Sequence, residues 1–226
     1  MGIVVKCNMY FVNLIYKKLI RPLLFRLDAE HAHDLASQLL SIAENSNISR
    51  RFIQFLSSKN SSDINLFGLS FPNHLGLGAG MDKNGSFPKS FASLGFGHIE
   101  IGTITPLAQS GNHKPRLFRY PKYNALVNRM GFNNDGADAI INRIKQIYPK
   151  GERSVPLGIN IGKGKNTPID KAHEDYIYCL NQSFLQADYI TVNISSPNPP
   201  NLRDLHKMDL VAPLLKILVS ANQSCA

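Results

Sequence analysis

The sequence predicts an α/β fold in which four β-α units follow a small helical subdomain. Two observations lead to this prediction. From residue 64 onward, short runs rich in Val and Ile alternate with longer segments whose apolar residues recur every three or four positions, the patterns of buried strands and amphipathic helices. In addition, small polar residues or lysine follow the strand-like runs, and a parallel sheet gathers such positions along one edge.

The composition is that of a globular protein with an excess of positive charge. Of 226 residues, 43% are hydrophobic and 18% are charged, so neither a disordered nor a membrane-spanning chain is expected. The formal net charge of +9 suits an anionic ligand or an anionic membrane surface. Because no pattern typical of RNA or DNA binding accompanies this charge, we expect no nucleic-acid partner.

The cysteines give no reason to expect a disulfide or a metal site. Cys7, Cys179 and Cys225 lie far apart in the chain and show no paired spacing. Zinc sites need closely spaced pairs of ligands, and disulfides form in oxidising compartments. We therefore expect reduced thiols and no bound metal.

The first predicted element, residues 2–27, is both basic and apolar. It carries five basic residues and no acidic one. Its apolar runs are too short for a transmembrane helix, which needs about 20 apolar residues. A segment of this kind can lie on a membrane surface, but the pattern also fits a helix packed on its own domain with a solvated basic face. These residues alone leave both interpretations open.

Two further helices complete the predicted helical subdomain, residues 1–60. Asp28 is a suitable N-cap for the first, because its carboxylate can accept backbone N–H groups of the first turn. Apolar residues at helical spacing follow up to residue 43, and a short apolar helix is expected at 51–56. So small a unit cannot bury all of these apolar side chains, and we expect some of them to be exposed.

Residues 61–226 form the predicted β-α domain. A hairpin is expected at 64–71, turning at Gly68. Strands are expected at 75–77, 98–103, 157–162 and 189–194, and helices at 87–94, 134–148, 171–184 and 208–219. A glycine-rich loop, 78–85, follows the first of these strands, and a long loop, 105–132, follows the second. A connection as long as the second loop is usually functional.

Four β-α units are half of a (β/α)₈ barrel, a fold of about 250 residues. We therefore expect the chain to belong to the TIM-barrel family and to contain its first four units. An open four-stranded sheet is the alternative. Its outer strands would be exposed edges, however, whereas these apolar runs are typical of strands buried on both faces.

Polar side chains stand at or just beyond the ends of the predicted strands: Lys83, Thr103, Asn160, Asn193 and Ser196. For Ser-Ser-Pro-Asn at 195–198 taken alone, ordinary turn chemistry is the stronger interpretation. Its repetition at successive strand ends favours a ligand site, because α/β enzymes bind ligands at that edge of the sheet.

Six motifs resemble, in order and spacing, those of dihydroorotate dehydrogenase. They are LGLGAGMDK at 75–83, IEIGTITP at 99–106, GNHKPRLFR at 111–119, NRMGFNN at 128–134, GINIGK at 158–163 and NISSPN at 193–198. The likeness runs from about residue 11 to 205 and is strongest to the quinone-linked, membrane-associated class (class 2), of which this chain resembles the N-terminal part. It implies an FMN-containing (β/α)₈ barrel in pyrimidine biosynthesis, with N-terminal helices that form a quinone tunnel.

The resemblance also implies roles for individual residues. Those implied to hold FMN are Ala79, Gly80, Met81, Asp82, Lys83, Thr103, Asn160 and Asn193. Those implied to hold dihydroorotate or orotate are Lys83, Asn128, Arg129, Met130, Gly131, Phe132, Asn193 and Asn198. Amides suit the N–H and C=O groups of this planar ring and lysine suits its carboxylate. Ser196 matches the catalytic base, which is cysteine in soluble relatives.

The implied partners are a lipophilic quinone and a membrane surface. A peripheral position on the cytoplasmic face of a bacterial inner membrane follows from the resemblance to the quinone-linked class. Two departures stand out. Pro199 replaces a threonine thought to carry the proton away from the serine, and the family's later flavin and substrate residues have no counterpart in these 226 residues.

Two other functions remain open at the level of sequence. The chain could be an inactive half-barrel that binds only a membrane or a protein partner, or an FMN barrel that acts on another pyrimidine. The motif at 128–134 together with the N-terminal helices favours dihydroorotate over other pyrimidines. A polypeptide of these residues alone is expected to be inactive, because the glycine-rich loops that bind the FMN phosphate in the family are missing.

Overall fold

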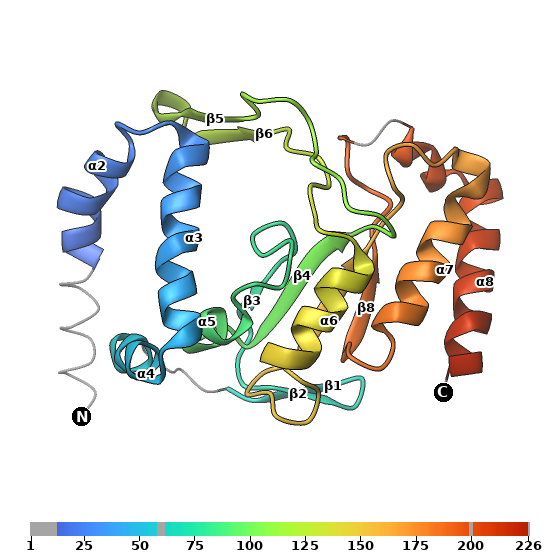
Figure 1. The fold of residues 1–226 in the computed structure, drawn as a ribbon, viewed down its shortest axis with the longest axis horizontal. Helices are drawn as coiled ribbons and strands as arrows, with labels where there is room; N and C mark the ends of the chain where they lie inside the picture. The colour runs from blue at the N-terminus through green and yellow to red at the C-terminus, as the bar shows by residue number, and fades with distance from the viewer. Residues whose placement is uncertain (1–12, 58–61, 199–200, 226) are drawn as a thin grey trace.

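A computed structural model describes residues 13–57, 62–198 and 201–225 (Figure 1). Its centre is a four-stranded sheet in the order β3-β4-β7-β8, in which all neighbouring strands are parallel. The strands are β3 (Gly76–Leu77), β4 (His98–Ile104), β7 (Leu157–Ile161) and β8 (Tyr189–Val192). The parallel α/β organisation predicted from the sequence is therefore confirmed.

Each strand of this sheet is followed by a helix. The helices are α5 (Pro88–Ser93), α6 (Ala137–Ile147), α7 (Ala172–Ser183) and α8 (Met208–Cys225), and short 3₁₀ turns precede the last two, η3 (Ile169–Lys171) and η4 (Leu202–His206). In Figure 1, α6, α7 and α8 cover one flank of the sheet. The last helix continues six residues beyond the predicted end at residue 219.

The core lies between the sheet and these helices. All residues of β7 are buried, whereas all residues of β8, at the edge of the sheet, are only half-buried. The fully buried apolar side chains come mainly from β4, β7 and α6: Ile99, Ile101, Ile104, Leu157, Ile159, Ile161, Ile140 and Ile144. Strands that are covered on both faces select such unbroken runs of β-branched residues.

The helical elements described before residue 58 are η1 (Tyr16–Ile20), a π-helical turn, α2 (Arg21–Leu24), α3 (Ala29–Asn45) and α4 (Asn47–Leu56). The predicted cap is confirmed, because the Asp28 carboxylate accepts the backbone N–H of Glu30 at 2.8 Å. Figure 1 shows α3 at the opposite end of the molecule from α7 and α8. The predicted segment 2–27 lies partly outside the described residues.

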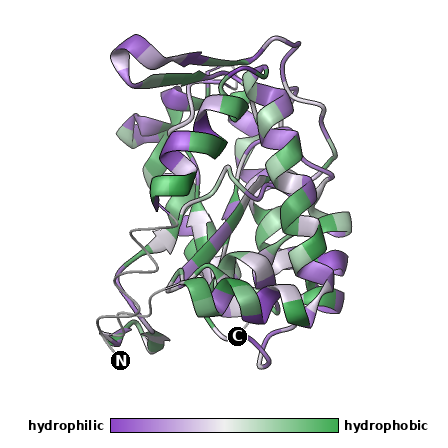
Figure 2. Ribbon diagram, turned by 90° about the vertical axis from the view of Figure 1, so that its left-hand side faces the viewer, coloured by the Kyte–Doolittle hydropathy of each residue, from purple (hydrophilic) through white to green (hydrophobic). Residues whose placement is uncertain are grey.

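Many apolar side chains of these helices face solvent. Exposed fractions exceed 60% at Leu19, Leu23, Leu39, Ile42, Ile48, Phe52 and Phe55. Figure 2, which views the molecule from this side, shows hydrophobic and hydrophilic positions alternating along the helices. Within the described part of the chain, no helix is both long enough and apolar enough to cross a membrane.

Two antiparallel hairpins flank the sheet. The predicted hairpin at 64–71 is confirmed as β1 (Ile64–Leu66) and β2 (Leu69–Phe71), with positive φ at Phe67 and Gly68, which is the backbone that a two-residue hairpin turn requires. The second hairpin, β5 (Leu117–Tyr120) and β6 (Ala125–Asn128), is joined by the 3₁₀ turn η2 (Pro121–Tyr123).

The second hairpin and the start of α6 correct the sequence prediction. Residues 105–132 were expected to be one loop, but they contain the hairpin of β5 and β6. Every residue of β6 is exposed, so this strand lacks the alternation of apolar and polar residues that would have predicted it. Helix α6 begins at Ala137, after Gly136 with φ 86°, rather than at 134. The Asn134 amide donates instead to Thr105 Oγ1 at 2.9 Å and to the Phe132 carbonyl at 2.7 Å.

Candidate functional site

Three of the predicted residues meet at the C-terminal ends of β4, β7 and β8. The Thr103 hydroxyl donates to Asn160 Oδ1 at 2.5 Å, and Asn193 Nδ2 donates to Thr103 Oγ1 at 2.8 Å and to Asn160 Oδ1 at 3.2 Å. Thr103 and Asn160 are buried. The expected convergence of polar strand ends is therefore observed for these three side chains.

Glu100, on β4, binds the Asn160 side chain of this cluster and was not predicted. Its carboxylate accepts hydrogen bonds from Asn160 Nδ2 at 2.8 Å and from Thr191 Oγ1 at 2.9 Å. The Asn160 amide nitrogen is thereby directed toward Glu100, and its oxygen is left for the cluster. A charged residue inside an otherwise apolar strand was the available sequence indication.

The glycine-rich loop after β3 packs against the end of β4. Gly80 N donates to the Gly102 carbonyl at 2.8 Å, and Gly102 N donates to the Asp82 carbonyl at 3.1 Å. The Asp82 side chain is buried and accepts the backbone N–H groups of Ser86 and Phe87 at 2.8 and 2.9 Å. Burial raises the pKa of this carboxyl group. Asp82 thus stabilises the conformation of the loop through these hydrogen bonds.

Lys83 follows directly and is half-buried. Its ammonium group donates to Asn133 Oδ1 at 2.8 Å and lies 3.5 Å from Met130 Sδ. Burial, and then the nearby positive charge of Arg116, lower the pKa of Lys83 to about 8. Asn133 was not among the predicted site residues, although it belongs to the motif at 128–134.

The predicted substrate segment divides into exposed and buried residues. Asn128 is exposed, and its Oδ1 accepts the backbone N–H of Met130 at 2.9 Å. Arg129 donates to the Pro115 carbonyl at 3.1 Å. Met130 and Phe132 are each 7% exposed. The side chains of this segment therefore face different surroundings, and the substrate contacts expected of residues 128–132 all stay predictions.

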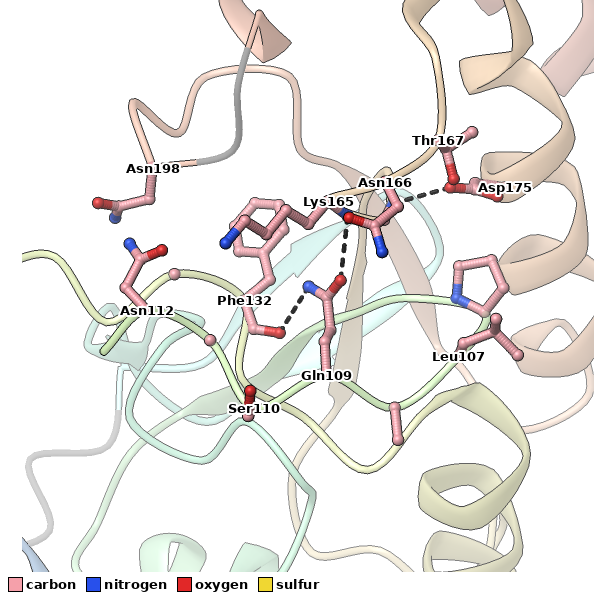
Figure 3. A pocket seen from close by; sticks show the side chains of 15 residues that line it. Leu107, Gln109, Ser110, Asn112, Phe132, Lys165, Asn166, Thr167, Asp175 and Asn198 are labelled. Atoms are coloured by element: carbon pink, nitrogen blue, oxygen red, sulfur yellow. Dashed lines mark hydrogen bonds between the residues drawn. The ribbon is translucent and has the colours of Figure 1, made fainter. Parts of the chain in front are cut away.

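A cavity of about 440 Å³ opens between the loops that follow β4 and β7 (Figure 3). Of the predicted residues, Gly131, Phe132 and Asn198 line it. Lining residues that the sequence prediction missed include Gln109, Asn112, Lys165, Asn166, Thr167 and Asp175. In Figure 3 the Lys165 side chain extends toward the side of the cavity that carries Asn112 and Asn198. The cluster of Thr103, Asn160 and Asn193 is separate from this lining.

Gln109 joins the two loops that border the cavity. Its Nε2 donates to the Phe132 carbonyl at 2.8 Å, and its Oε1 accepts the backbone N–H of Lys165 at 3.0 Å (Figure 3). These contacts link segments that are far apart in sequence, so no local pattern could have predicted them.

Ser196 lies in the turn after β8. It is half-buried, and its Oγ accepts the backbone N–H of Asn198 at 3.3 Å. Asn193 Oδ1 accepts the backbone N–H of Ser195 at 3.2 Å, which fixes the start of the same turn. Pro199, at which the sequence departs from the family pattern, lies outside the described residues.

Comparisons with known proteins agree with this architecture. A family profile described as dihydroorotate dehydrogenase matches residues 61–225. Similar curated proteins include the dihydroorotate dehydrogenases (quinone) of a Psychrobacter species and of Saccharophagus degradans. Both are 48% identical to this chain over 208 residues, which is 92% of the chain and 58% or 59% of the relative.

Solved structures give the same result. A structure of Eimeria tenella DHODH in complex with ferulenol has a TM-score of 0.75 and 35% identity, covering 86% of this chain and 51% of that one. The ligand-free form has a TM-score of 0.68 and 36% identity. This likeness and the parallel sheet fit the TIM-barrel family, although the chain spans only 51–59% of the length of these relatives. The chain belongs to the dihydroorotate dehydrogenase family.

Proposed function

We propose that the protein acts as a dihydroorotate dehydrogenase (quinone), which oxidises dihydroorotate to orotate through FMN and passes the electrons to a membrane quinone, a step of pyrimidine biosynthesis. The observation that carries the proposal is the cluster of Thr103, Asn160 and Asn193 at the ends of three parallel strands. Polar groups at this edge are where α/β barrels bind cofactor and substrate.

The residues around this cluster fit a flavin. Asn160 and Asn193 carry amide groups, which are of the kind that complements the N–H and C=O edge of an isoalloxazine ring. In this structure these groups bind one another, Thr103 and Glu100. Nothing lies within 4 Å of the position that a Cβ would occupy at Gly78 or Gly80, so a flat ring can approach the backbone there. Asn160, Asn193 and Gly80, with Ala79, Met81, Asp82, Lys83 and Thr103, would hold FMN, which would accept a hydride when bound.

The proposed substrate contacts use charge and hydrogen bonding. The Lys83 ammonium group would bind the carboxylate of dihydroorotate, and Asn193 and Asn198 its amide groups. The segment 128–132 would complete the site. Ser196 would accept the proton from C5 of the substrate. A serine hydroxyl is a weak base, so it needs polar neighbours and a site closed to water.

The edge of the sheet supports the proposal that residues 61–226 form the first four units of a (β/α)₈ barrel. Strand β8 and helix α8 border an apolar hollow of about 820 Å³, whose lining includes Tyr189, Ile190, Val192, Leu215 and Leu218. An exposed strand edge beside apolar side chains is the arrangement that a further strand would cover. The relatives are long enough to supply the remaining units.

The N-terminal helices are the proposed membrane and quinone surface, forming a subdomain of residues 1–60. Their exposed apolar side chains and basic residues suit a peripheral position on an anionic bilayer. For this protein we propose the cytoplasmic face of a bacterial inner membrane. A lipophilic quinone would then reach the flavin directly from the bilayer.

The test is an assay of the complete reading frame that contains residues 1–226, purified with FMN. We expect dihydroorotate to bleach the bound flavin under anaerobic conditions, and a lipophilic quinone to restore its colour with formation of one orotate per cycle. A flavoprotein that is bleached by another reduced pyrimidine but not by dihydroorotate would overturn the proposed substrate. A preparation that binds no FMN would overturn the proposed cofactor.

The lowered pKa of Lys83 predicts a pH dependence for the same reaction. Because Lys83 is charged only below its pKa of about 8, its attraction for the substrate carboxylate is present at pH 7 and is lost above pH 8. We expect kcat/KM for dihydroorotate to fall by about tenfold per pH unit above that value. Lys83→Met should have a low kcat/KM without this fall. A wild-type profile that stays flat up to pH 10 would contradict the role of Lys83.

A further inference from the structure

A buried ion pair joins α3 to the loop that lines the cavity. Arg116 Nε and Nη2 donate to Glu30 Oε1 at 3.1 and 2.9 Å. The two residues are 9% and 6% exposed. Lys114 Nζ reaches the same oxygen at 3.1 Å, but its side chain is largely in solvent. Glu30 is therefore the acidic partner that compensates a buried guanidinium charge.

Arg116 uses its remaining nitrogen on the backbone of the cavity loop. Nη1 donates to the carbonyl groups of Ser110 at 2.7 Å and Asn112 at 3.0 Å, and both residues line the cavity. Gly111, between them, has φ 78°, and a Cβ there would lie 2.3 Å from the Met130 carbonyl oxygen. The loop is thus folded closely around the guanidinium group.

The same contacts extend to the surroundings of Lys83. Asn112 N donates to the Met130 carbonyl at 2.8 Å, and the Arg116 carbonyl accepts the backbone N–H of Arg129 at 2.9 Å. Met130 Sδ in turn lies 3.5 Å from Lys83 Nζ. A series of direct contacts therefore connects Glu30, on α3, to Lys83, the residue proposed to bind the substrate carboxylate.

We propose that Glu30 is a positioning residue for the ligand site: by holding the Arg116 guanidinium group it fixes the loop at 110–112 and the surroundings of Lys83. The N-terminal helices would then contribute to the ligand site in addition to forming the proposed membrane surface. The inference rests on the proposed function only in taking Lys83 as the cation that binds substrate. Removing Glu30 leaves a buried charge without its partner, which strongly destabilises its surroundings.

The electrostatics of Lys83 agree with this role. The charged groups that act on Lys83 are Arg116 from the loop and Glu30 from α3. The titratable His33 on α3 also lies near Lys83, and burial and then the Lys83 charge lower the pKa of His33. Arg116 lowers the pKa of Lys83 and Glu30 raises it. Loss of the Glu30 charge should therefore lower the pKa of Lys83 below about 8, because the Arg116 charge is then less compensated.

The test compares Glu30→Gln with Glu44→Gln in the purified product of the complete reading frame. Glu44 is a matched control, because it is a second buried carboxylate of α3 and binds Ser90 N and Oγ, at 2.8 and 3.0 Å, on α5. In Glu30→Gln we expect amide hydrogen exchange of residues 108–116 to be at least about tenfold faster. In Glu44→Gln the faster exchange should be confined to the region of α5.

A second measurement separates positioning from a general loss of structure. Titration of the Lys83 side chain by NMR should give a lower pKa in Glu30→Gln and the wild-type pKa in Glu44→Gln. Glu30→Asp keeps the charge on a shorter side chain, so its exchange rate at 108–116 and its Lys83 pKa should both fall between those of wild type and Glu30→Gln. This variant replaces Glu30→Gln in both measurements if Glu30→Gln does not fold.

Two results would overturn the proposal: equal exchange at 108–116 in both glutamine variants, or a Lys83 pKa that depends on neither carboxylate. Neither measurement uses dihydroorotate or FMN. A negative result therefore leaves the proposed enzymatic activity untouched, and an inactive protein leaves the role of Glu30 open to the same two measurements.

Discussion

Replacing Ser196 with alanine in the complete flavoprotein is expected to slow the bleaching of the flavin by dihydroorotate by about 10² or more, the usual contribution of a positioned base. Flavin content should stay nearly unchanged, because the flavin would be held by Asn160, Asn193 and the loop after β3. Anaerobic stopped-flow absorbance measures the rate, and the absorbance ratio of flavin to protein measures the content.

Ser195→Ala is the matched control for this experiment. Ser195 is the neighbouring serine of the same turn, and it is exposed. Its hydroxyl makes only a long contact of 3.4 Å to Asn193 Oδ1. The control should therefore bleach at close to the wild-type rate. Equal rates in Ser196→Ala and wild type would remove Ser196 from the mechanism.

The second large effect is expected on the exposed apolar face of α4. Phe52 and Phe55 are 62% and 72% exposed and are three residues apart, so they share one side of the helix. Burying one such side chain in a bilayer is worth about 1.5–3 kcal/mol. Phe52→Asp with Phe55→Asp should therefore weaken vesicle binding by about 10² or more and slow quinone reduction, measured by vesicle sedimentation and a quinone assay.

Bleaching of the flavin by dihydroorotate should be unaffected in this double variant, since the two half-reactions would use different surfaces. Gln54→Asp is the control, because it adds a negative charge to the same helix without removing an apolar side chain. Wild-type vesicle binding by the double variant would count against the membrane surface. Point variants are preferred to deletion of residues 1–60, because a deletion also removes Glu30 and Glu44, which bind the β-α domain.

The period of apolar residues was sufficient to predict the parallel sheet and its helices. Ile99, Ile101, Ile159 and Ile161 are completely buried, which is the environment that unbroken β-branched runs require. Once the strands were known to be parallel, the meeting of Thr103, Asn160 and Asn193 followed, because the carboxyl ends of such strands share one edge. The motifs between them were also sufficient to predict the family.

Elements held by nonlocal contacts could not be predicted in this way. The hairpin of β5 and β6 has an exposed second strand, and it is anchored by Arg119, which donates to the Leu24 and Leu27 carbonyl groups. Asn134, expected to be the first residue of a helix, instead lies before α6 and binds Thr105 and Phe132. Local sequence patterns contain no information about partners of this kind.

By itself the sequence determined the fold class, the family and the strand ends that carry polar side chains, because each depends on residues that are close in the chain or on their regular repetition. Only the tertiary structure decided which loops line the cavity and how Lys83 is surrounded. Glu30 and Arg116 are 86 residues apart. Their pairing depends on α3 packing beside the loop after β4, because burial away from water is what makes each charge require the other.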